Sequence, residues 1–107
     1  MLATVVSRPT DTRAILDAAS KSLTSDLLGL TGHGTILGFP AARITGLSEE
    51  HGHVDLGSCP TRPQIGDKVQ IVPNHACRVS NLVDRVIFHR SGVVLRAQMV
   101  AARGTVQ

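Results

Sequence analysis

The sequence predicts a mainly β fold, a small β-barrel or sandwich with one or two short helices, in one domain spanning residues 1–107. Three observations favour this class. Short apolar runs recur at spacings of about ten residues, which is typical of such folds. Glycine and proline separate the runs, and aromatic residues make up only 2% of the chain. The core is therefore expected to be aliphatic.

The predicted strands follow the β-branched and alternating runs in chain order. Val5 and Val6 lie in the first run, which we expect Pro9 to stop. Val54 and Leu56 share one face of a later run, and Ser91-Gly92 is a plausible tight hairpin turn. The predicted strands are residues 2–7, 12–17, 35–39, 42–47, 51–56, 68–72, 85–89 and 93–101.

Two segments have the composition of short helices. Residues 20–28 have Ser20 as a possible N-cap and Gly29 as a possible stop. If residues 16–23 were helical, Asp17 and Lys21 would have the i,i+4 spacing of an ion pair on one helix face. Residues 76–83 would form one or two turns at most.

The clearest candidate site is residues 73–77, with the sequence PNHAC, in which His75 and Cys77 are potential metal ligands. Imidazole nitrogen and thiolate sulfur are good ligands for Zn²⁺. On an ideal helix these two side chains would point about 200° apart, so a shared site favours a junction between a strand and a turn. The alternatives are a hydrogen-bonded loop histidine at 75 and a buried apolar cysteine at 77.

A second cluster, residues 47–53, holds two acids together with His51 and His53. The simplest interpretation is a solvated turn that opens a strand. A functional interpretation makes His51 a neighbour of the metal, or makes His51, His53 or Cys59 further ligands in a closed structural zinc site. The spacings match no standard zinc finger.

Charge and hydropathy exclude several functions. The net charge is only +3, the arginines form no run, and base-stacking aromatics are nearly absent, so we expect no nucleic-acid partner. No segment reaches the ~18 consecutive apolar residues of a membrane span. No signal-peptide pattern is visible at the N-terminus. We therefore expect a cytoplasmic protein with reduced thiols.

Five blocks of the sequence together resemble one enzyme family. In order they are residues 4–9 (TVVSRP), 16–21 (LDAASK), 47–52 (LSEEHG), 73–77 (PNHAC) and 100–104 (VAARG). This series is similar to the C-terminal domain of the D-serine dehydratase and D-threonine aldolase family, and it covers nearly the whole chain. One departure is Ala19, where the family usually has glycine.

The resemblance implies a function shared between two domains. Family members are fold-type III pyridoxal-phosphate enzymes, similar in architecture to alanine racemase, and an N-terminal barrel carries the Schiff-base lysine. The C-terminal domain supplies a divalent-metal site, whose ligands would be His75 and Cys77 here. Zn²⁺ is the favoured metal because thiolate is a soft ligand, with Mn²⁺ or Mg²⁺ as alternatives.

The chain is too short for that barrel, which typically needs about 250 residues. We therefore expect pyridoxal phosphate to bind only with a separate barrel domain or subunit, and no catalysis by this chain alone. Without that barrel domain, the face of this chain that would pack against it is either exposed to solvent or paired with a second copy of the chain. We therefore expect a homodimer. The alternative is a free-standing, non-catalytic β-domain with a structural or interaction role.

Overall fold

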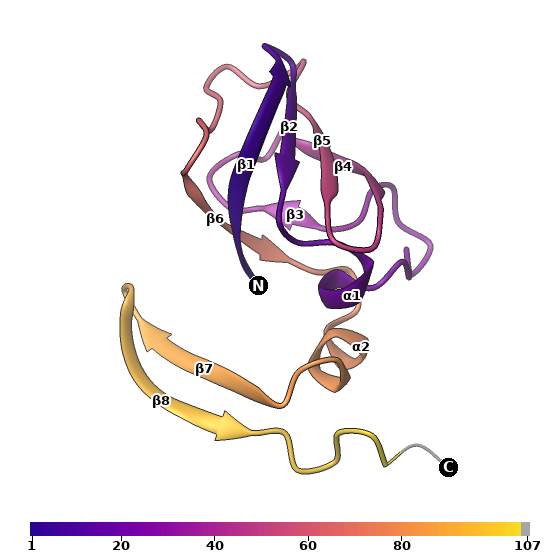
Figure 1. Ribbon diagram of the computed structural model, residues 1–107, viewed down its shortest axis with the longest axis vertical. Helices are drawn as coiled ribbons and strands as arrows, with labels where there is room; N and C mark the ends of the chain where they lie inside the picture. The colour runs from indigo at the N-terminus through magenta and orange to yellow at the C-terminus, as the bar shows by residue number, and fades with distance from the viewer. Residues whose placement is uncertain (106–107) are drawn as a thin grey trace.

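The structure is a computed structural model that describes residues 1–105. The chain forms a barrel-like sheet, followed by a separate two-stranded hairpin (Figure 1). The barrel contains β1 (Leu2–Thr10), β2 (Arg13–Leu16), β3 (Thr35–Ile36), β4 (Arg43–Leu47), β5 (Gly52–Asp55) and β6 (Lys68–Val72). The hairpin contains β7 (Arg85–Arg90) and β8 (Val93–Met99), and the helices are α1 (Ser20–Leu23) and α2 (Ala76–Asn81). The predicted mainly β class is confirmed.

The six-stranded sheet curls until its two ends approach each other. Its strand order is β3-β6-β1-β2-β5-β4, and neighbouring strands are antiparallel. The backbone amide of His33, just before β3, donates to the carbonyl of Ile44 in β4 at 3.0 Å. Because this bond joins the segment before β3, the first strand of the order, to β4, the last, the sheet is a nearly closed barrel.

An aliphatic core fills the barrel, as the low aromatic content predicted. Alternate residues of the strands point inward, which is the period of a sheet with one buried face. Val54 and Leu56 are both buried, so the shared face predicted for them is confirmed. The core residues are Ala3, Val5, Ala14, Leu16, Ala18, Leu23, Ile36, Ala42, Ile44, Val54, Leu56, Cys59, Val69 and Ile71.

The largest differences from the predicted strand boundaries are in β1 and β3, whereas the other strands match to within one or two residues at each end. β1 runs through Pro9 to Thr10, because the β1–β2 register shifts between Ser7 and Thr10, where a missing amide donor is tolerated. β3 ends at Ile36 rather than at residue 39, because Gly38 adopts a positive φ of 83° and starts a turn.

The first helix is much shorter than the predicted residues 20–28. It spans only Ser20–Leu23, and its N-cap is Ala19 rather than Ser20. Thr24 has a φ of 62°, which ends the helix and sends the chain into a long loop. The second helix ends at Asn81, two residues before the predicted boundary at residue 83.

The hairpin and the turn after it form an arm, defined here as residues 85–105. The predicted turn at Ser91-Gly92 is present, and both residues have positive φ values of 50° and 82°. Every residue of β8 is exposed. In Figure 1 the arm extends away from the barrel, and α2 is the connection between the two parts. No helix in residues 1–105 is both long enough and apolar enough to cross a membrane.

Candidate metal centre

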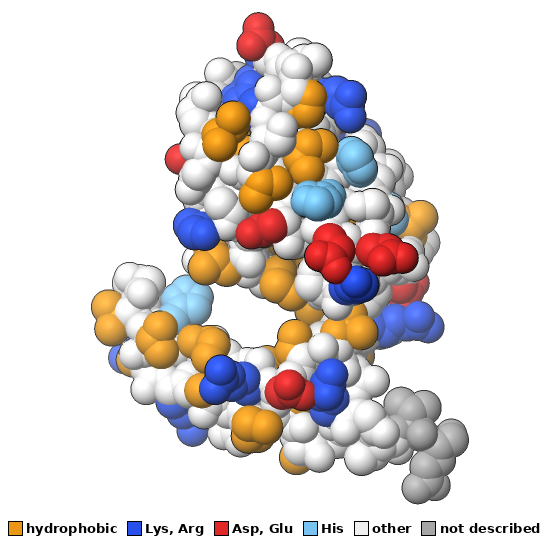
Figure 2. Space-filling model, viewed as in Figure 1, with side chains coloured by type: hydrophobic (Ala, Val, Ile, Leu, Met, Phe, Trp, Pro, Cys, Tyr) orange, Lys and Arg blue, Asp and Glu red, His pale blue; other side chains and the backbone are white. Residues whose placement is uncertain are grey.

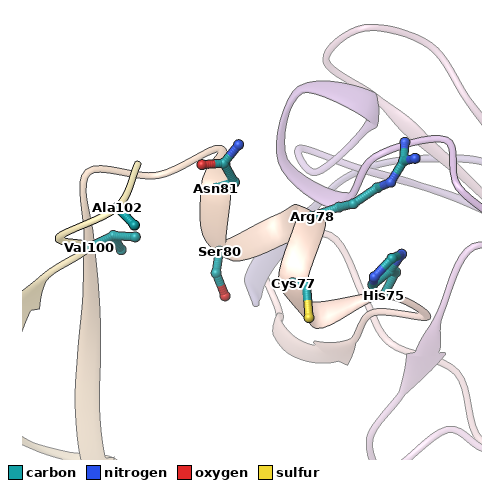
Figure 3. Close-up of a pocket in the computed structure, with 7 residues that line it drawn as sticks. All are labelled: His75, Cys77, Arg78, Ser80, Asn81, Val100 and Ala102. Atoms are coloured by element: carbon teal, nitrogen blue, oxygen red, sulfur yellow. The ribbon is translucent and has the colours of Figure 1, made fainter. Parts of the chain in front are cut away.

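His75 and Cys77 lie where β6 leads into α2. His75 is the N-cap residue, with the non-helical dihedral angles φ −130° and ψ 89°, and Cys77 is the second residue of the helix. Because His75 lies outside the helix, the opposed directions expected of a helical pair do not apply. Both side chains line one open pocket of about 430 Å³, with Val100 and Ala102 on its other side (Figure 3).

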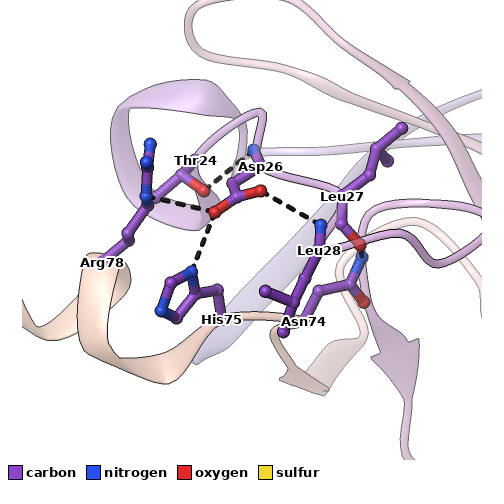
Figure 4. Close-up of polar contacts among 7 residues, drawn as sticks. All are labelled: Thr24, Asp26, Leu27, Leu28, Asn74, His75 and Arg78. Atoms are coloured by element: carbon purple, nitrogen blue, oxygen red, sulfur yellow. Dashed lines mark hydrogen bonds and ion pairs between the residues drawn. The ribbon is translucent and has the colours of Figure 1, made fainter.

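The imidazole of His75 is held by a carboxylate from a distant loop. Its Nδ1 atom lies 2.8 Å from Oδ2 of Asp26, and both side chains are partly buried. Nε of Arg78 approaches the same oxygen at 3.1 Å, while Oδ1 of Asp26 accepts the amide of Leu28 at 3.0 Å (Figure 4). The carboxylate therefore has donors on both of its oxygens.

These contacts determine which nitrogen of His75 is free. The hydrogen bond from His75 and then the amide of Leu28 hold the pKa of Asp26 below its ordinary value, so Asp26 is an ionised acceptor. Nδ1 of His75 must then be the donor. In the neutral ring Nε2 keeps its lone pair, which is the arrangement of a histidine whose other nitrogen binds a metal.

The side chain of Asn74, beside His75, forms hydrogen bonds with the loop that carries Asp26. Its side-chain amide donates to the carbonyls of Leu27 at 3.0 Å and Gly32 at 2.8 Å. Asp26 itself is positioned by its backbone amide, which donates to Oγ1 of Thr24 at 3.1 Å. Asp26 and Asn74, the neighbour of His75, are thus each held by hydrogen bonds between a side chain and the backbone.

The two alternatives for this pair fare differently. A buried apolar role for Cys77 is wrong, because the thiol is exposed. The alternative of a hydrogen-bonded loop histidine is correct for His75, because its ring forms a hydrogen bond with Asp26. The hydrogen bond involves Nδ1, and the same ring lines the pocket beside Cys77. His75 and Cys77 therefore line the same open pocket, and their role as ligands stays a prediction.

The closed structural zinc site is wrong for the described residues. Cys59 is buried in the barrel core, and His53 lies in β5. No group of three or more His, Cys, Asp or Glu side chains within residues 1–105 is arranged to hold a metal. His51 belongs to the turn between β4 and β5, where its amide bonds Oγ of Ser48 at 3.1 Å. The partner of His75 is Asp26 rather than His51.

The predicted pair of Asp17 and Lys21 is also wrong. Lys21 bonds Glu50 at 2.6 Å and approaches Glu49 at 3.7 Å, because the β4–β5 turn lies beside α1. Asp17 instead accepts the backbone amide of Thr4. These contacts attach α1 to the barrel edge.

Asp26 and Asn74 are the residues of the candidate site that sequence reasoning missed. Asp26 fell inside the predicted helix, where it would have been a surface residue. Asn74 stood next to His75 in the PNHAC block and was given no role. A run of Thr24, Ser25 and Asp26 favours a turn over a helix interior, because these side chains bond nearby backbone groups. That was the available signal.

Comparison with protein families gives one match over most of the chain. Residues 1–89 match the family described as "Putative serine dehydratase domain". Uncharacterized proteins of Mycobacterium tuberculosis and Mycobacterium bovis are 40% identical over 108 residues, which cover 95% of this chain and 80% of each relative. A D-threonine aldolase of an Arthrobacter species is 36% identical over 104 residues, 97% of this chain and 26% of that enzyme.

Solved structures with this fold are also known. D-threonine aldolase of Filomicrobium marinum is 32% identical, with a TM-score of 0.86, over 99% of this chain and 28% of that chain. D-threo-3-hydroxyaspartate dehydratase of Delftia sp. HT23 is 24% identical, with a TM-score of 0.74, over 92% of this chain and 31% of that chain. The chain thus spans less than a third of either enzyme.

Proposed function

We propose, because this chain belongs to the serine dehydratase domain family, that it is the metal-binding C-terminal domain of a lyase acting on D-3-hydroxy amino acids. His75 and Cys77 are the proposed ligands, and pyridoxal phosphate is assigned to a separate barrel domain or subunit. The observation that carries the proposal is the hydrogen bond from Nδ1 of His75 to Asp26, which leaves Nε2 without that partner in a residue that lines the same pocket as Cys77.

The donor set fits a divalent metal. Imidazole nitrogen and thiolate sulfur favour Zn²⁺ over Mn²⁺ or Mg²⁺, and two protein ligands leave positions open for substrate. A bound metal would act as a Lewis acid toward a hydroxyl or alkoxide oxygen. Asp26 orients the His75 ring, and Arg78 adds positive charge beside the same carboxylate. Solved variants of a D-threo-3-hydroxyaspartate dehydratase offer a parallel: one replaces a histidine, the other replaces a cysteine two positions later, and the cysteine variant is in a metal-free form.

This function requires a partner for the rest of the chemistry. The aldolases that the chain matches are several times longer, since it spans 26% and 28% of them. The lysines of this chain are already engaged: Lys21 pairs with Glu50, and Lys68 bonds Oγ1 of Thr4 at 2.6 Å. We therefore assign the Schiff-base lysine to the barrel partner.

A free-standing, non-catalytic role is the second candidate, and the mycobacterial relatives favour it. An alignment of 108 residues covers 80% of those proteins. They are therefore also too short for a (β/α)₈ barrel of about 250 residues. Domains of this family thus occur in chains that cannot hold the barrel.

Metal binding by the purified chain tests the first proposal. We expect about one Zn²⁺ per chain by isothermal titration and elemental analysis. His75→Ala and Cys77→Ala should each abolish stoichiometric binding, because each removes one of two protein ligands. With Co²⁺, a thiolate-to-metal charge-transfer band should appear and should be lost in Cys77→Ala.

His51→Ala is the matched control, since it removes an exposed histidine from the β4–β5 turn. It should bind Zn²⁺ like the unaltered chain. Stoichiometric binding that survives both His75→Ala and Cys77→Ala would refute the assigned ligands. Absence of stoichiometric Zn²⁺, Mn²⁺ or Mg²⁺ from the unaltered chain would favour the non-catalytic alternative.

A further inference from the structure

The loop between α1 and β3, residues 24–34, is held mainly by polar contacts. Leu27, Leu28 and Leu30 in this loop are 41%, 56% and 56% exposed, so they add little apolar packing. Leu28 also has a φ of 50°, a left-handed conformation that a branched side chain adopts only where surrounding contacts impose it. A loop with so little burial needs other contacts to keep one conformation.

Those contacts come from one short stretch of the chain. Within residues 1–105, the hydrogen bonds and ion pairs from residues 25–32 to segments distant in sequence all go to Asn74, His75 and Arg78. The arm does not replace them, and Figure 2 shows an open hollow between the arm and the barrel. The position of the loop therefore depends on the segment that carries the candidate ligands.

Asn74 makes the two bonds that span the loop. Its Nδ2 atom donates to the carbonyl oxygen of Leu27 at 3.0 Å and to that of Gly32 at 2.8 Å. Both hydrogens of the carboxamide nitrogen are thus engaged. A side chain of similar size without these donors would release both bonds at once.

The backbone that Asn74 holds also directs the carboxylate of Asp26. Asp26 directly precedes Leu27, and its Oδ1 accepts the amide of Leu28 at 3.0 Å. Its Oδ2 lies 2.8 Å from Nδ1 of His75, the residue that follows Asn74 (Figure 4). The contacts therefore form a closed ring from Asn74 through the loop to His75. A shift of the loop would move the carboxylate away from the imidazole.

We propose that Asn74 is a positioning residue of the candidate site: by holding the loop, it keeps Asp26 against His75 and fixes the orientation and the tautomer of the imidazole. A neutral ring without this partner can carry its proton on Nε2, the nitrogen assigned to the metal. The consequence for metal affinity rests on the proposed function, whereas the consequence for the ring does not.

Nuclear magnetic resonance of the zinc-free chain tests the effect on the ring. In alkaline buffer, where imidazole rings are neutral, the nitrogen-15 shifts of His75 should place the proton on Nδ1 in the unaltered chain. Asn74→Leu keeps the approximate size of the side chain but removes both donors. It should give a mixture that includes the tautomer with the proton on Nε2.

Asn81→Leu is the matched control for this measurement. Asn81 is the other asparagine of the chain and lines the same pocket, but its Oδ1 accepts the amide of Gly104 at 3.2 Å. Its replacement should leave the tautomer of His75 and the affinity for Zn²⁺ unchanged.

Competition with a chelator measures the effect on metal affinity. Asn74→Leu should raise the dissociation constant for Zn²⁺ on the order of tenfold to a hundredfold, the usual effect of losing an outer partner of a ligating histidine. The stoichiometry should be kept, because His75 and Cys77 both remain. In an Asp26→Ala background the same change should have less than about a twofold effect, because the two residues act through one contact.

The two measurements separate failure of this inference from failure of the proposed function. An unchanged tautomer in Asn74→Leu would overturn the inference, whether or not the chain binds zinc. A loss of affinity that is equally large in the Asp26→Ala background would overturn the route through Asp26. Absence of zinc binding from the unaltered chain would refute the proposed function instead, and the tautomer would then decide the role of Asn74.

Circular dichroism checks that each variant remains folded. If Asn74→Leu does not fold, Asn74→Ala takes its place, because it removes the same two donors without adding an apolar side chain.

Discussion

The barrel and the arm are built from the same kinds of residues but end in opposite environments. Val5 and Ile44 in the barrel are fully buried, whereas Val94 and Ile87 in the arm are 65% and 52% exposed. Both regions have the β-branched composition that favours strands. The difference teaches that this composition determines where strands form, while burial depends on whether a second surface is available.

The largest expected effect separates two isoleucines. Ile44→Ala should lower the free energy of unfolding by about 2–5 kcal/mol, because it leaves a cavity in a closed core. Ile87→Ala should change it by no more than about 0.5 kcal/mol in dilute, monomeric protein, because exposed side chains lose little. Urea denaturation measures both. Equal losses would mean that Ile87 is packed as closely as Ile44 and would contradict its exposure.

A pair of glycines gives a smaller contrast. A Cβ at Gly52 would lie 2.6 Å from the carbonyl oxygen of Ala18, so Gly52→Ala should cost the barrel about 1–3 kcal/mol by overpacking. Gly92 has open space but a φ of 82°, so alanine there adds about 1–2 kcal/mol of strain confined to the hairpin turn. Hydrogen exchange should show barrel amides less protected in the first variant, and only β7–β8 amides in the second.

The smallest effect concerns the ion pair at the α1 edge. Its hydrogen bond with Lys21 holds the pKa of Glu50 below the ordinary 4.5, so the stabilisation is present above that pH and is lost as the pH falls through the lowered value. The same contact raises the pKa of Lys21 above 10.5, so its contribution is lost only as the pH rises beyond that value.

Glu50→Gln should therefore remove a small part of the pH dependence of unfolding in acid, measured by denaturation at pH values above and below 4.5. Both groups are exposed, so solvent screens the effect. Glu49→Gln, which removes the longer 3.7 Å contact with Lys21, should change the profile less. An equal change in both variants would show that the shorter contact is not the one that matters.

Local patterns were enough to predict most of the barrel. The alternation in residues 68–72 predicted β6 with its bounds unchanged, because Val69 and Ile71 point into the core. The helix over residues 20–28 could not be bounded in the same way. The helix ends at Thr24, which has a positive φ of 62°, and helix propensity does not predict a positive φ at a threonine.

The candidate site was predictable only in part. The PNHAC block predicted His75 and Cys77 as candidate ligands because both are close in sequence, and the structure places both at one pocket. Asp26 lies 49 residues away from His75, so no local pattern could pair them. The same limit applies to the arm: the apolar run in β8 reads like a buried strand, and only the tertiary structure reveals that nothing within residues 1–105 covers it.

The contact between Asp26 and His75 also sets an order of events during synthesis. Asp26 follows α1, whereas His75 follows β6, the last barrel strand to leave the ribosome. In the folded chain, β6 pairs with β1 and β3 and so places His75 opposite Asp26. In a nascent or misfolded chain the side chains of Asp26 and His75 are therefore apart. Their hydrogen bond indicates that the six-stranded barrel of this chain has formed.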